Sequence, residues 1–220
     1  LYRMGFIDHL RADYYTLVGE VRSVTLADGS RVDLNTDSAI IVRYSQGERK
    51  IQLLRGEAFF EVARNPEQPF TVDDSSLKAT ALGTQYSVRA ASDDSLGTVR
   101  VEHGRVEVKS REQQVVLEAG DAANLTAKGA FAVTKTDVAN ETAWRTGKLV
   151  FSGQPLREVL ATLERYRRGR ILVLDNAAAD QQVSGIFDLK DTDQALRVLA
   201  ESLPVSVTHL TDLMVIVRSR

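Results

Sequence analysis

The 220-residue chain contains no cysteine, one tryptophan, two methionines and four prolines. Without cysteine it forms neither a disulfide nor a thiolate-bound zinc site, so either redox compartment can accommodate it. It also lacks an apolar run of about 18 residues, the length typical of a membrane-spanning helix. Its 28 basic and 30 acidic side chains leave a net charge of −2. Because nucleic-acid-binding proteins usually carry a basic face, this balance argues against that class.

The motifs of common enzymes and metal sites are absent as well. The three histidines, His9, His103 and His209, have no second histidine or cysteine at metal-ligand spacing. The glycine-rich phosphate-binding patterns and the G-x-S-x-G nucleophile pattern do not occur. We therefore expect no metal, no cofactor and no conventional active site.

Two carboxylates in the stretch "EAFFEV" raise the question of acid/base chemistry. The stretch is rich in β-formers and is bounded by turn residues, so it is predicted to be a strand in which Glu57 and Glu61 share one face. Four residues separate them by about 13 Å, whereas the carboxylates of a glycosidase lie about 5–9.5 Å apart. We interpret Phe60 and Val62 as core, and the two glutamates as solvated or paired with arginine.

Residues 14–135 follow a strand–turn–strand pattern. Apolar and polar residues alternate on both sides of Asp28-Gly29 and again around His103-Gly104, which indicates two hairpins. Many short strands with regular turns predict an all-β domain over residues 1–135.

The periodicity changes after Trp144. A helix is predicted where Pro155 precedes Leu156, Val159, Leu160 and Leu163 at helical spacing. A second helix begins at Asp191, a capping residue, and is stopped by Pro204. Strands around them give the order β-α-β, then β-α-β-β. The predicted fold class is thus two domains, an all-β domain and a small α/β domain (144–220), joined by a polar linker at 136–143.

Two features of the second domain suggest a protein partner. The strand at 213–217 is apolar on both faces. If helices cover the face of Met214 and Ile216, then Leu213, Val215 and Val217 need another cover: a second small sheet, the β domain or a partner. The alternative is that this strand is internal core.

An arginine cluster, Arg165, Arg167 and Arg168, ends the first helix of this domain. Cations there suit the helix dipole. They can also steer an acidic partner towards the same domain.

The dipeptide Gly83-Thr84 is chemically competent for self-cleavage. A threonine hydroxyl can attack the preceding carbonyl and convert the amide to an ester, and glycine tolerates the strained backbone that this needs. The alternative is a simple turn.

Several long stretches resemble FecR-type sigma regulators of Gram-negative bacteria. They are "ADYYTLVGEVRSVTLADGSRVDLNTDS", "LLRGEAFFEVARNPEQPF", "LGTQYSVR", "EAGDAANLT" and "WRTGKLVFSGQPLREVLATLERY". The second half is similar to the short N-terminal domain of secretins and TonB-dependent transducers. The resemblance follows the chain in order over nearly its whole length.

The resemblance implies a periplasmic, signal-receiving region of a single-pass inner-membrane anti-sigma regulator. Its implied partner is the N-terminal signalling domain of an outer-membrane TonB-dependent transducer, typically a ferric-siderophore receptor. Periplasmic and intramembrane proteases would then release a sigma factor, which is bound by a cytoplasmic segment absent from this chain. Some members cleave a Gly-Thr bond, and Gly83-Thr84 matches that position. Two alternatives remain open: a module that only cleaves itself, and a periplasmic ligand- or glycan-binding module.

Overall fold

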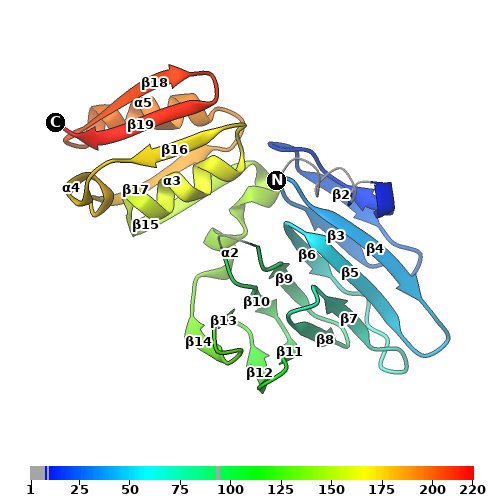
Figure 1. Ribbon diagram of the computed structural model, residues 1–220. Coiled ribbons are helices and arrows are strands. Elements are labelled where there is room, and N and C mark those ends of the chain that lie inside the picture. Colours follow the sequence, from blue (N-terminus) through cyan, green and yellow to red (C-terminus); the bar gives the residue numbers. More distant parts are fainter. Residues whose placement is uncertain (1–7, 9, 93–94) are drawn as a thin grey trace. The chain divides into compact units, whose positions relative to one another are not determined.

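Figure 1 shows a computed structural model of the chain, which describes residue 8, residues 10–92 and residues 95–220. The chain divides into two compact units, Leu1–Thr142 and Ala143–Arg220. Strands predominate in the described residues, as expected from the sequence. No helix in this part of the chain is long and apolar enough to cross a membrane.

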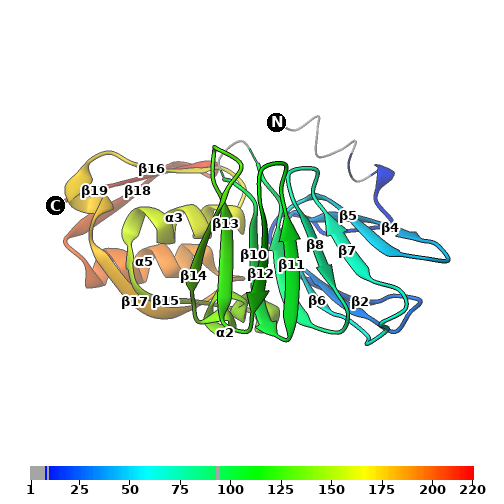
Figure 2. The same cartoon turned by 90° about the horizontal axis from the view of Figure 1, so that it is seen from below.

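Unit 1 contains two large sheets that face each other (Figure 2). In spatial order, the first consists of β1 (Tyr14–Tyr15), β4 (Ala39–Tyr44), β5 (Arg49–Arg55), β7 (Phe70–Asp73), β8 (Lys78–Ala81), β11 (Arg105–Lys109) and β12 (Gln114–Glu118). The second consists of β14 (Phe131–Lys135), β13 (Asp121–Leu125), β10 (Thr98–His103), β9 (Gln85–Arg89), β6 (Glu57–Glu61), β3 (Arg31–Leu34) and β2 (Arg22–Thr25). Neighbouring strands pair antiparallel except β5 and β7, which are parallel.

The core of unit 1 lies between these sheets and draws side chains from both. On β11, for example, Val106 and Val108 point into the core, while the charged residues that alternate with them, Arg105, Glu107 and Lys109, are exposed. Phe60 on β6 is fully buried, and its ring centroid lies 5.7 Å from that of Phe70 and 5.5 Å from that of Tyr86. Val62 is buried beside it, so the assignment of Phe60 and Val62 to the core is confirmed.

The polar stretch expected to be a linker at 136–143 instead contains helix α2 (Val138–Glu141). Asp137 caps the helix by accepting the Asn140 N–H, and Thr142 donates its hydroxyl to the Val138 carbonyl at 2.7 Å. The buried side chain of Val138 anchors this short helix to unit 1. A single apolar residue creates no periodicity, which explains why the sequence pattern gave no helix here.

Unit 2 begins with a 3-10 helix, η1 (Ala143–Thr146). Its further elements are β15 (Lys148–Pro155), α3 (Leu156–Arg165), β16 (Arg170–Val173), α4 (Asn176–Ala179), β17 (Gln182–Asp188), α5 (Thr192–Ser202), β18 (Val205–Thr211) and β19 (Met214–Ser219). Strands β15 and β17 form a two-stranded antiparallel sheet. A three-stranded sheet has the order β16-β19-β18, with β16 parallel and β18 antiparallel to β19.

The two long helices of unit 2 are those predicted from the sequence. Helix α3 buries the four apolar residues at helical spacing, Leu156, Val159, Leu160 and Leu163. Helix α5 begins where Asp191 accepts the Gln194 N–H at 2.8 Å, and it buries Ala195, Leu196 and Leu199. Both helices therefore present one apolar stripe to the core and a polar stripe to solvent.

Candidate functional site

Strand β19 is the central strand of its sheet. The docking surface expected from the sequence, which was placed on this strand, therefore needs correction. The backbone of β19 pairs with β16 on one side and β18 on the other, so β19 offers no free edge. Val215 and Val217 are 0% and 1% exposed, so neither can receive a partner, and their assignment to the docking surface was wrong. Leu213 lies in the turn before β19 and is exposed.

The opposite face of this sheet is the accessible one. Leu172 on β16 and Met214 on β19 are 44% and 37% exposed, and Ile216 is half-buried between β16 and β18. The register places Leu172 beside Ile216 and Ile216 beside Thr208. Because β19 is apolar on both faces, its period of two does not reveal which face meets the helices, and only the three-dimensional packing decides.

Two arginines frame this apolar centre. Arg170 pairs in register with Met214, and Arg218 follows two residues after Ile216 on the same face. We call the six residues Arg170, Leu172, Thr208, Met214, Ile216 and Arg218 the outer face. It carries two positive charges and no acidic residue. Methionine and arginine are enriched at protein interfaces, whose buried centres are also more apolar than the rest of the surface, so this composition suits a protein partner.

The predicted arginine cluster does not form one open patch. The Arg165 guanidinium lies 5.9 Å from the centre of the Tyr166 ring. Arg167 is largely buried, and its Nη1 lies 3.2 Å from Asp193 Oδ1, without the geometry of a hydrogen bond. Arg168 is the exposed member. Two of the three arginines thus make contacts within unit 2, which weakens their case as a docking site.

The Gly83–Thr84 bond lies in unit 1, where the turn after β8 enters β9. Gly83 has φ +153°, and a Cβ built there would lie 3.0 Å from Arg64 Cβ and 3.1 Å from Arg64 Cα. Glycine is therefore required by the backbone conformation and by the close approach of Arg64. The neighbouring backbone is held on both sides, because Asn65 N–H donates to the Leu82 carbonyl at 3.2 Å and Val62 N–H donates to the Thr84 carbonyl at 2.9 Å.

The hydroxyl of Thr84 is buried and, among the described residues, has no hydrogen-bond partner. Buried hydroxyls without a hydrogen-bond partner are rare, because removing such a group from water without replacing its hydrogen bonds costs about 1–3 kcal/mol. Arg49 Nη2, Tyr86 OH and Ser87 Oγ share this state in unit 1, but only the Thr84 oxygen is adjacent in the chain to the Gly83 carbonyl.

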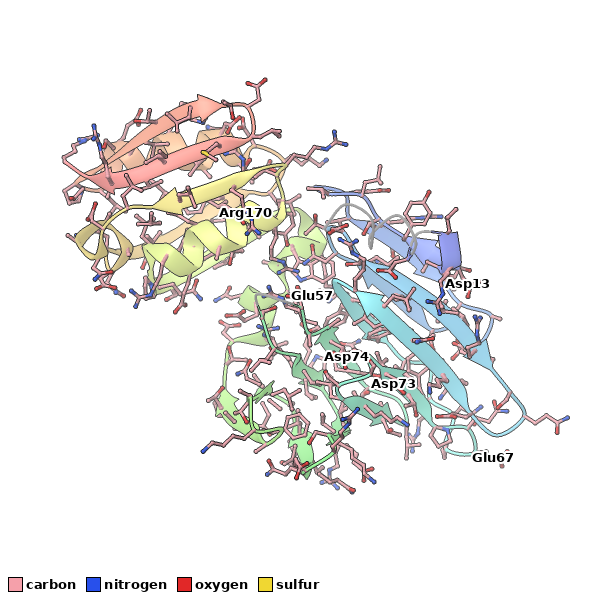
Figure 3. All side chains as sticks on the ribbon, in the orientation of Figure 1. Asp13, Glu57, Glu67, Asp73, Asp74 and Arg170 are labelled. Atoms are coloured by element: carbon pink, nitrogen blue, oxygen red, sulfur yellow. The ribbon has the colours of Figure 1, made fainter. Side chains whose placement is uncertain are left out.

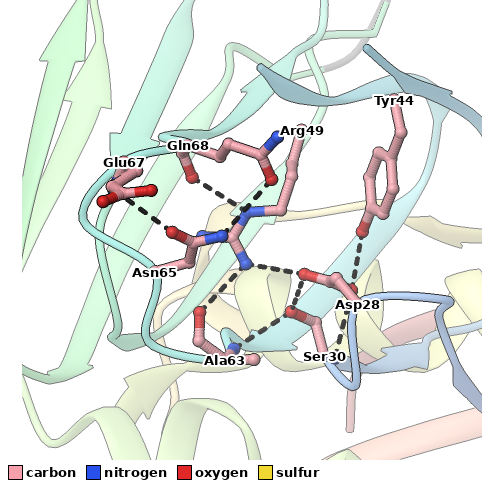
Figure 4. A network of polar contacts seen from close by, with 8 residues as sticks. All are labelled: Asp28, Ser30, Tyr44, Arg49, Ala63, Asn65, Glu67 and Gln68. Carbon is pink, nitrogen blue, oxygen red and sulfur yellow. Dashed lines mark hydrogen bonds and ion pairs between the residues drawn. The ribbon is translucent and has the colours of Figure 1, made fainter. Parts of the chain in front are cut away.

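A buried polar network holds the segment next to this bond (Figure 4). Arg49 Nη1 lies 2.6 Å from Asp28 Oδ2 and also donates to the Ala63 carbonyl at 2.9 Å. Arg49 Nε donates to the Gln68 carbonyl at 2.9 Å, and the guanidinium lies 5.4 Å from the Phe70 ring centre. One fully buried arginine thus fixes both ends of residues 63–68, the segment that contacts Gly83.

Asp28 is the acidic centre of this network. Burial raises its pKa, but hydrogen bonds from Ser30, Arg49 and Tyr44 together outweigh burial and hold the pKa below its ordinary value. Burial and the hydrogen bond to Asp28 raise the pKa of the Tyr44 hydroxyl. The network is accordingly charged at neutral pH, with the Asp28 carboxylate facing the Arg49 guanidinium.

Glu57 and Glu61, the two glutamates of β6, form no common site (Figure 3 labels Glu57). Glu57 is buried, accepts the Asn35 amide at 3.1 Å and lies 4.0 Å from Arg100, whereas Glu61 is half-buried at the other end of β6. Within the described residues, no group of three histidine, aspartate or glutamate side chains is placed to hold a metal. His9 lies outside those residues. The Glu57–Arg100 contact agrees with the interpretation of this glutamate as paired.

One open hollow on the surface of unit 1 has a volume of about 570 Å³ and is lined by Gly104, Arg105, Glu118 and Ala119. No aromatic side chain is among these residues. Ligand sites are usually enclosed and lined by apolar and aromatic groups, so this hollow does not favour a ligand- or glycan-binding module.

Comparison with known proteins gives one family match and two similar crystal structures. Residues 12–107 match the family model described as FecR protein. Two crystal structures of a candidate anti-sigma factor from Parabacteroides distasonis are similar to the chain, with TM-scores of 0.79 and 0.78 and 27% and 26% identity. In each case the similarity covers 94% of this chain and 98% of the other. No curated protein gives a significant match. Residues 12–107 are thus similar to the FecR family, and the resemblance of the chain to FecR-type regulators is confirmed.

The outer face is the feature that sequence reasoning missed. The available signal was the run "RILVLD", which is apolar on both faces like β19. Two neighbouring strands with this property, in a domain with few helices, leave one sheet face without enough helical cover. The pattern therefore indicated a surplus apolar face but not which residues form it.

Proposed function

We propose that this chain is the periplasmic signal-receiving region of a transmembrane anti-sigma regulator. In this proposal unit 2 is a domain of the secretin/TonB short N-terminal type, and it binds the N-terminal signalling domain of a TonB-dependent outer-membrane transducer. Occupancy of the transducer by a ferric siderophore is then passed to the regulator, whose cytoplasmic segment holds a sigma factor. The FecR match and the similarity to a candidate anti-sigma factor support this class of function.

The outer face of unit 2 is the observation that carries the docking part of the proposal. Leu172 and Met214 are exposed on a sheet whose other face buries Ile171, Val205, Val215 and Val217, and Arg170 and Arg218 flank them. Removing such a cluster from water on binding stabilises a complex by about 25 cal/mol for each Å² of apolar surface. Isolated exposed leucines are common, but a contiguous apolar patch on a sheet is typical of an interaction site.

Titration of the full chain with purified transducer signalling domains tests this proposal. We expect Leu172→Lys to weaken binding at least about tenfold, since it places a charge at the centre of the interface. The matched control is Val116→Lys, which changes an exposed valine on β12 of unit 1. If Val116→Lys abolishes binding and Leu172→Lys does not, the partner docks on unit 1, and the assignment of docking to unit 2 is wrong. If no signalling domain binds at all, the proposed function fails.

A second candidate function, self-cleavage at Gly83-Thr84, is favoured by the buried, unpartnered Thr84 hydroxyl and the positive φ of Gly83. The Thr84 oxygen would attack the Gly83 carbonyl carbon, the C–N bond would break, and the hydroxyl proton would pass to the released amine. Water would then hydrolyse the ester, leaving a carboxylate on Gly83 and the free hydroxyl on Thr84.

Denaturing electrophoresis and mass spectrometry test this reaction. Because β8 pairs with β7 and β11, and β9 pairs with β6 and β10, the two pieces would stay associated until the fold is denatured. We expect fragments ending at Gly83 and beginning at Thr84, a single intact species for Thr84→Ala, and retained cleavage for Thr84→Ser. A wild-type chain that remains one full-length band after long incubation would rule the reaction out.

A further inference from the structure

We propose that the free edge of strand β18 receives a strand from the partner, with acidic side chains of that strand lying beside Arg218. The partner is the signalling domain of the proposed function, so the inference deepens that proposal and rests on it for the partner's identity. The site is the β18 edge together with the adjoining outer face, as defined above.

The two edges of the three-stranded sheet differ in whether their outward-pointing backbone groups are hydrogen-bonded. On β16, Arg170 N–H and Leu174 N–H donate across to the β19 side, so the N–H of Ile171 between them points away from the sheet. Glu164 Oε2 accepts this N–H at 2.7 Å, and Glu164 Oε1 lies 2.9 Å from Arg170 Nη1. A carboxylate thus occupies the β16 edge, and an added strand would have to displace it.

The β18 edge lacks such a cover. Arg220 N–H donates to the Pro204 carbonyl, which marks 204 and 220 as a hydrogen-bonded pair of the antiparallel ladder. Because these pairs alternate with non-hydrogen-bonded ones, Ser206 and Thr208 bond to β19 while Val207 and His209 direct their N–H and C=O groups outward. Among the described residues no side chain or backbone group is bonded to these outward groups.

The composition of β18 also fails to protect this edge. Exposed edge strands usually carry a lysine, a proline or an inward-pointing charge that discourages pairing. The strand reads "VSVTHLT", with no proline and no lysine, arginine, aspartate or glutamate. Its only bulge lies at its end, between His209 and Thr211. The edge is therefore suited to strand addition, in which main-chain hydrogen bonds supply affinity and side chains supply selectivity.

Arg218 sets the charge of the strand that fits. Its side chain reaches from β19 across β18, where Arg218 Nε lies 3.4 Å from Ser206 Oγ. Among the described residues, the contact of its guanidinium is with this serine and not with a carboxylate. Neighbouring strands lie about 4.8 Å apart, so a carboxylate on the outer face of an added strand falls within reach of this guanidinium.

The same arginine disfavours a second copy of this chain as the occupant. Two β18 edges paired antiparallel would bring the two Arg218 guanidinium groups towards one another with no acidic residue on either outer face. Like charges placed opposite each other destabilise strand pairing. An acidic strand from another protein gains the same backbone bonds and replaces repulsion by attraction.

Two synthetic peptides of about seven residues probe the site in the full chain, one alternating valine with aspartate and the other valine with lysine. We expect the aspartate peptide to bind about fivefold or more tightly than the lysine peptide at low salt. It should also slow hydrogen exchange at the Val207 and His209 amides, which point outward, and leave the Ile171 amide unchanged. Equal binding of the two peptides, or protection elsewhere only, would overturn the inference.

Two variants of His209 separate the contribution of its backbone N–H to peptide binding from that of its side chain. His209→Pro removes an outward N–H but none of the bonds between β18 and β19, and it should abolish peptide binding. His209→Ala keeps that N–H and should bind as the wild type does. Unchanged peptide binding by His209→Pro would contradict strand addition. A dimeric wild-type chain that becomes monomeric as His209→Pro would show that a second copy is the occupant, contrary to the proposal.

The transducer signalling domain forms the last arm of the experiment. Loss of its binding in His209→Pro supports both the edge site and the proposed function. If the domain binds the wild type and His209→Pro equally, the edge inference fails while the proposed function stands. If the aspartate peptide binds at β18 but no signalling domain does, the edge is a strand-binding site and the proposed function fails.

Discussion

Replacing Arg49 by methionine should destabilise unit 1 by about 3–4 kcal/mol. Removing one partner of a buried ion pair usually costs about 3–5 kcal/mol, because the other charge stays buried. Asp28 keeps its hydrogen bonds from Ser30 and Tyr44, which places the effect in the lower part of that range. The stated loss includes that of the donors to the carbonyls of Ala63 and Gln68, which the same guanidinium serves.

Urea unfolding of the full chain, followed by circular dichroism of the β-structure, measures this loss. The matched control is Arg43→Met on the neighbouring strand β4, since Arg43 pairs with Asp13 at the surface, with both side chains well exposed. Exposed pairs contribute about 0–1 kcal/mol, so this variant should differ little from the wild type. A loss below about 1 kcal/mol for Arg49→Met, or an equal loss for Arg43→Met, would refute the structural role given to Arg49.

The same network predicts a dependence on pH. Because the pKa of Asp28 is lower in the folded chain, its contribution is complete above the unfolded value of about 3.9 and is lost as pH falls through the folded value. Wild-type stability should therefore fall more steeply below about pH 4 than that of Asp28→Asn. Parallel curves for the two proteins would contradict the assignment of a charged Asp28–Arg49 pair.

Three further predictions concern the turn at Gly83 and unit 2. Gly83→Ala should lower stability by about 1–3 kcal/mol in urea unfolding, because alanine tolerates neither the φ of +153° nor the approach of Arg64; an unchanged midpoint would argue against this. Val215→Lys should abolish folding of unit 2, while Met214→Lys leaves the far-UV spectrum unchanged, since only the first buries an unpaired charge; identical spectra would reverse our assignment of the two faces. Asp191→Ala should cost about 1 kcal/mol through the lost cap of α5, which hydrogen exchange of its first turn can measure.

The sequence predicted the elements whose pattern is local. Helices α3 and α5 follow from their apolar spacing, and the cap at Asp191 is where a capping residue precedes an apolar run. The burial of Phe60 follows from strand alternation combined with a β-rich surrounding. These features depend on neighbours a few residues away, which is the range over which a pattern is informative.

The sequence could not predict features that depend on distant strands. The inward face of β19 is set by its pairing with β16 and β18, and the apolar residues on both of its faces concealed the choice. The role of Arg49 was missed because its partners, Asp28, Ala63 and Gln68, lie 14 to 21 residues away in the chain. The Gly83–Thr84 bond was found as a dipeptide, but the buried hydroxyl that makes it a candidate is visible only in the fold.

Hydrogen exchange of the full chain, with and without a bound transducer signalling domain, tests the central claim most directly. The account predicts that binding slows exchange in β18 and along the outer face of unit 2, most at the amides of Val207 and His209. It predicts little change in residues 12–107, the segment that matches the FecR family model. Protection confined to residues 12–107, with β18 exchanging as fast as in the free chain, would contradict it.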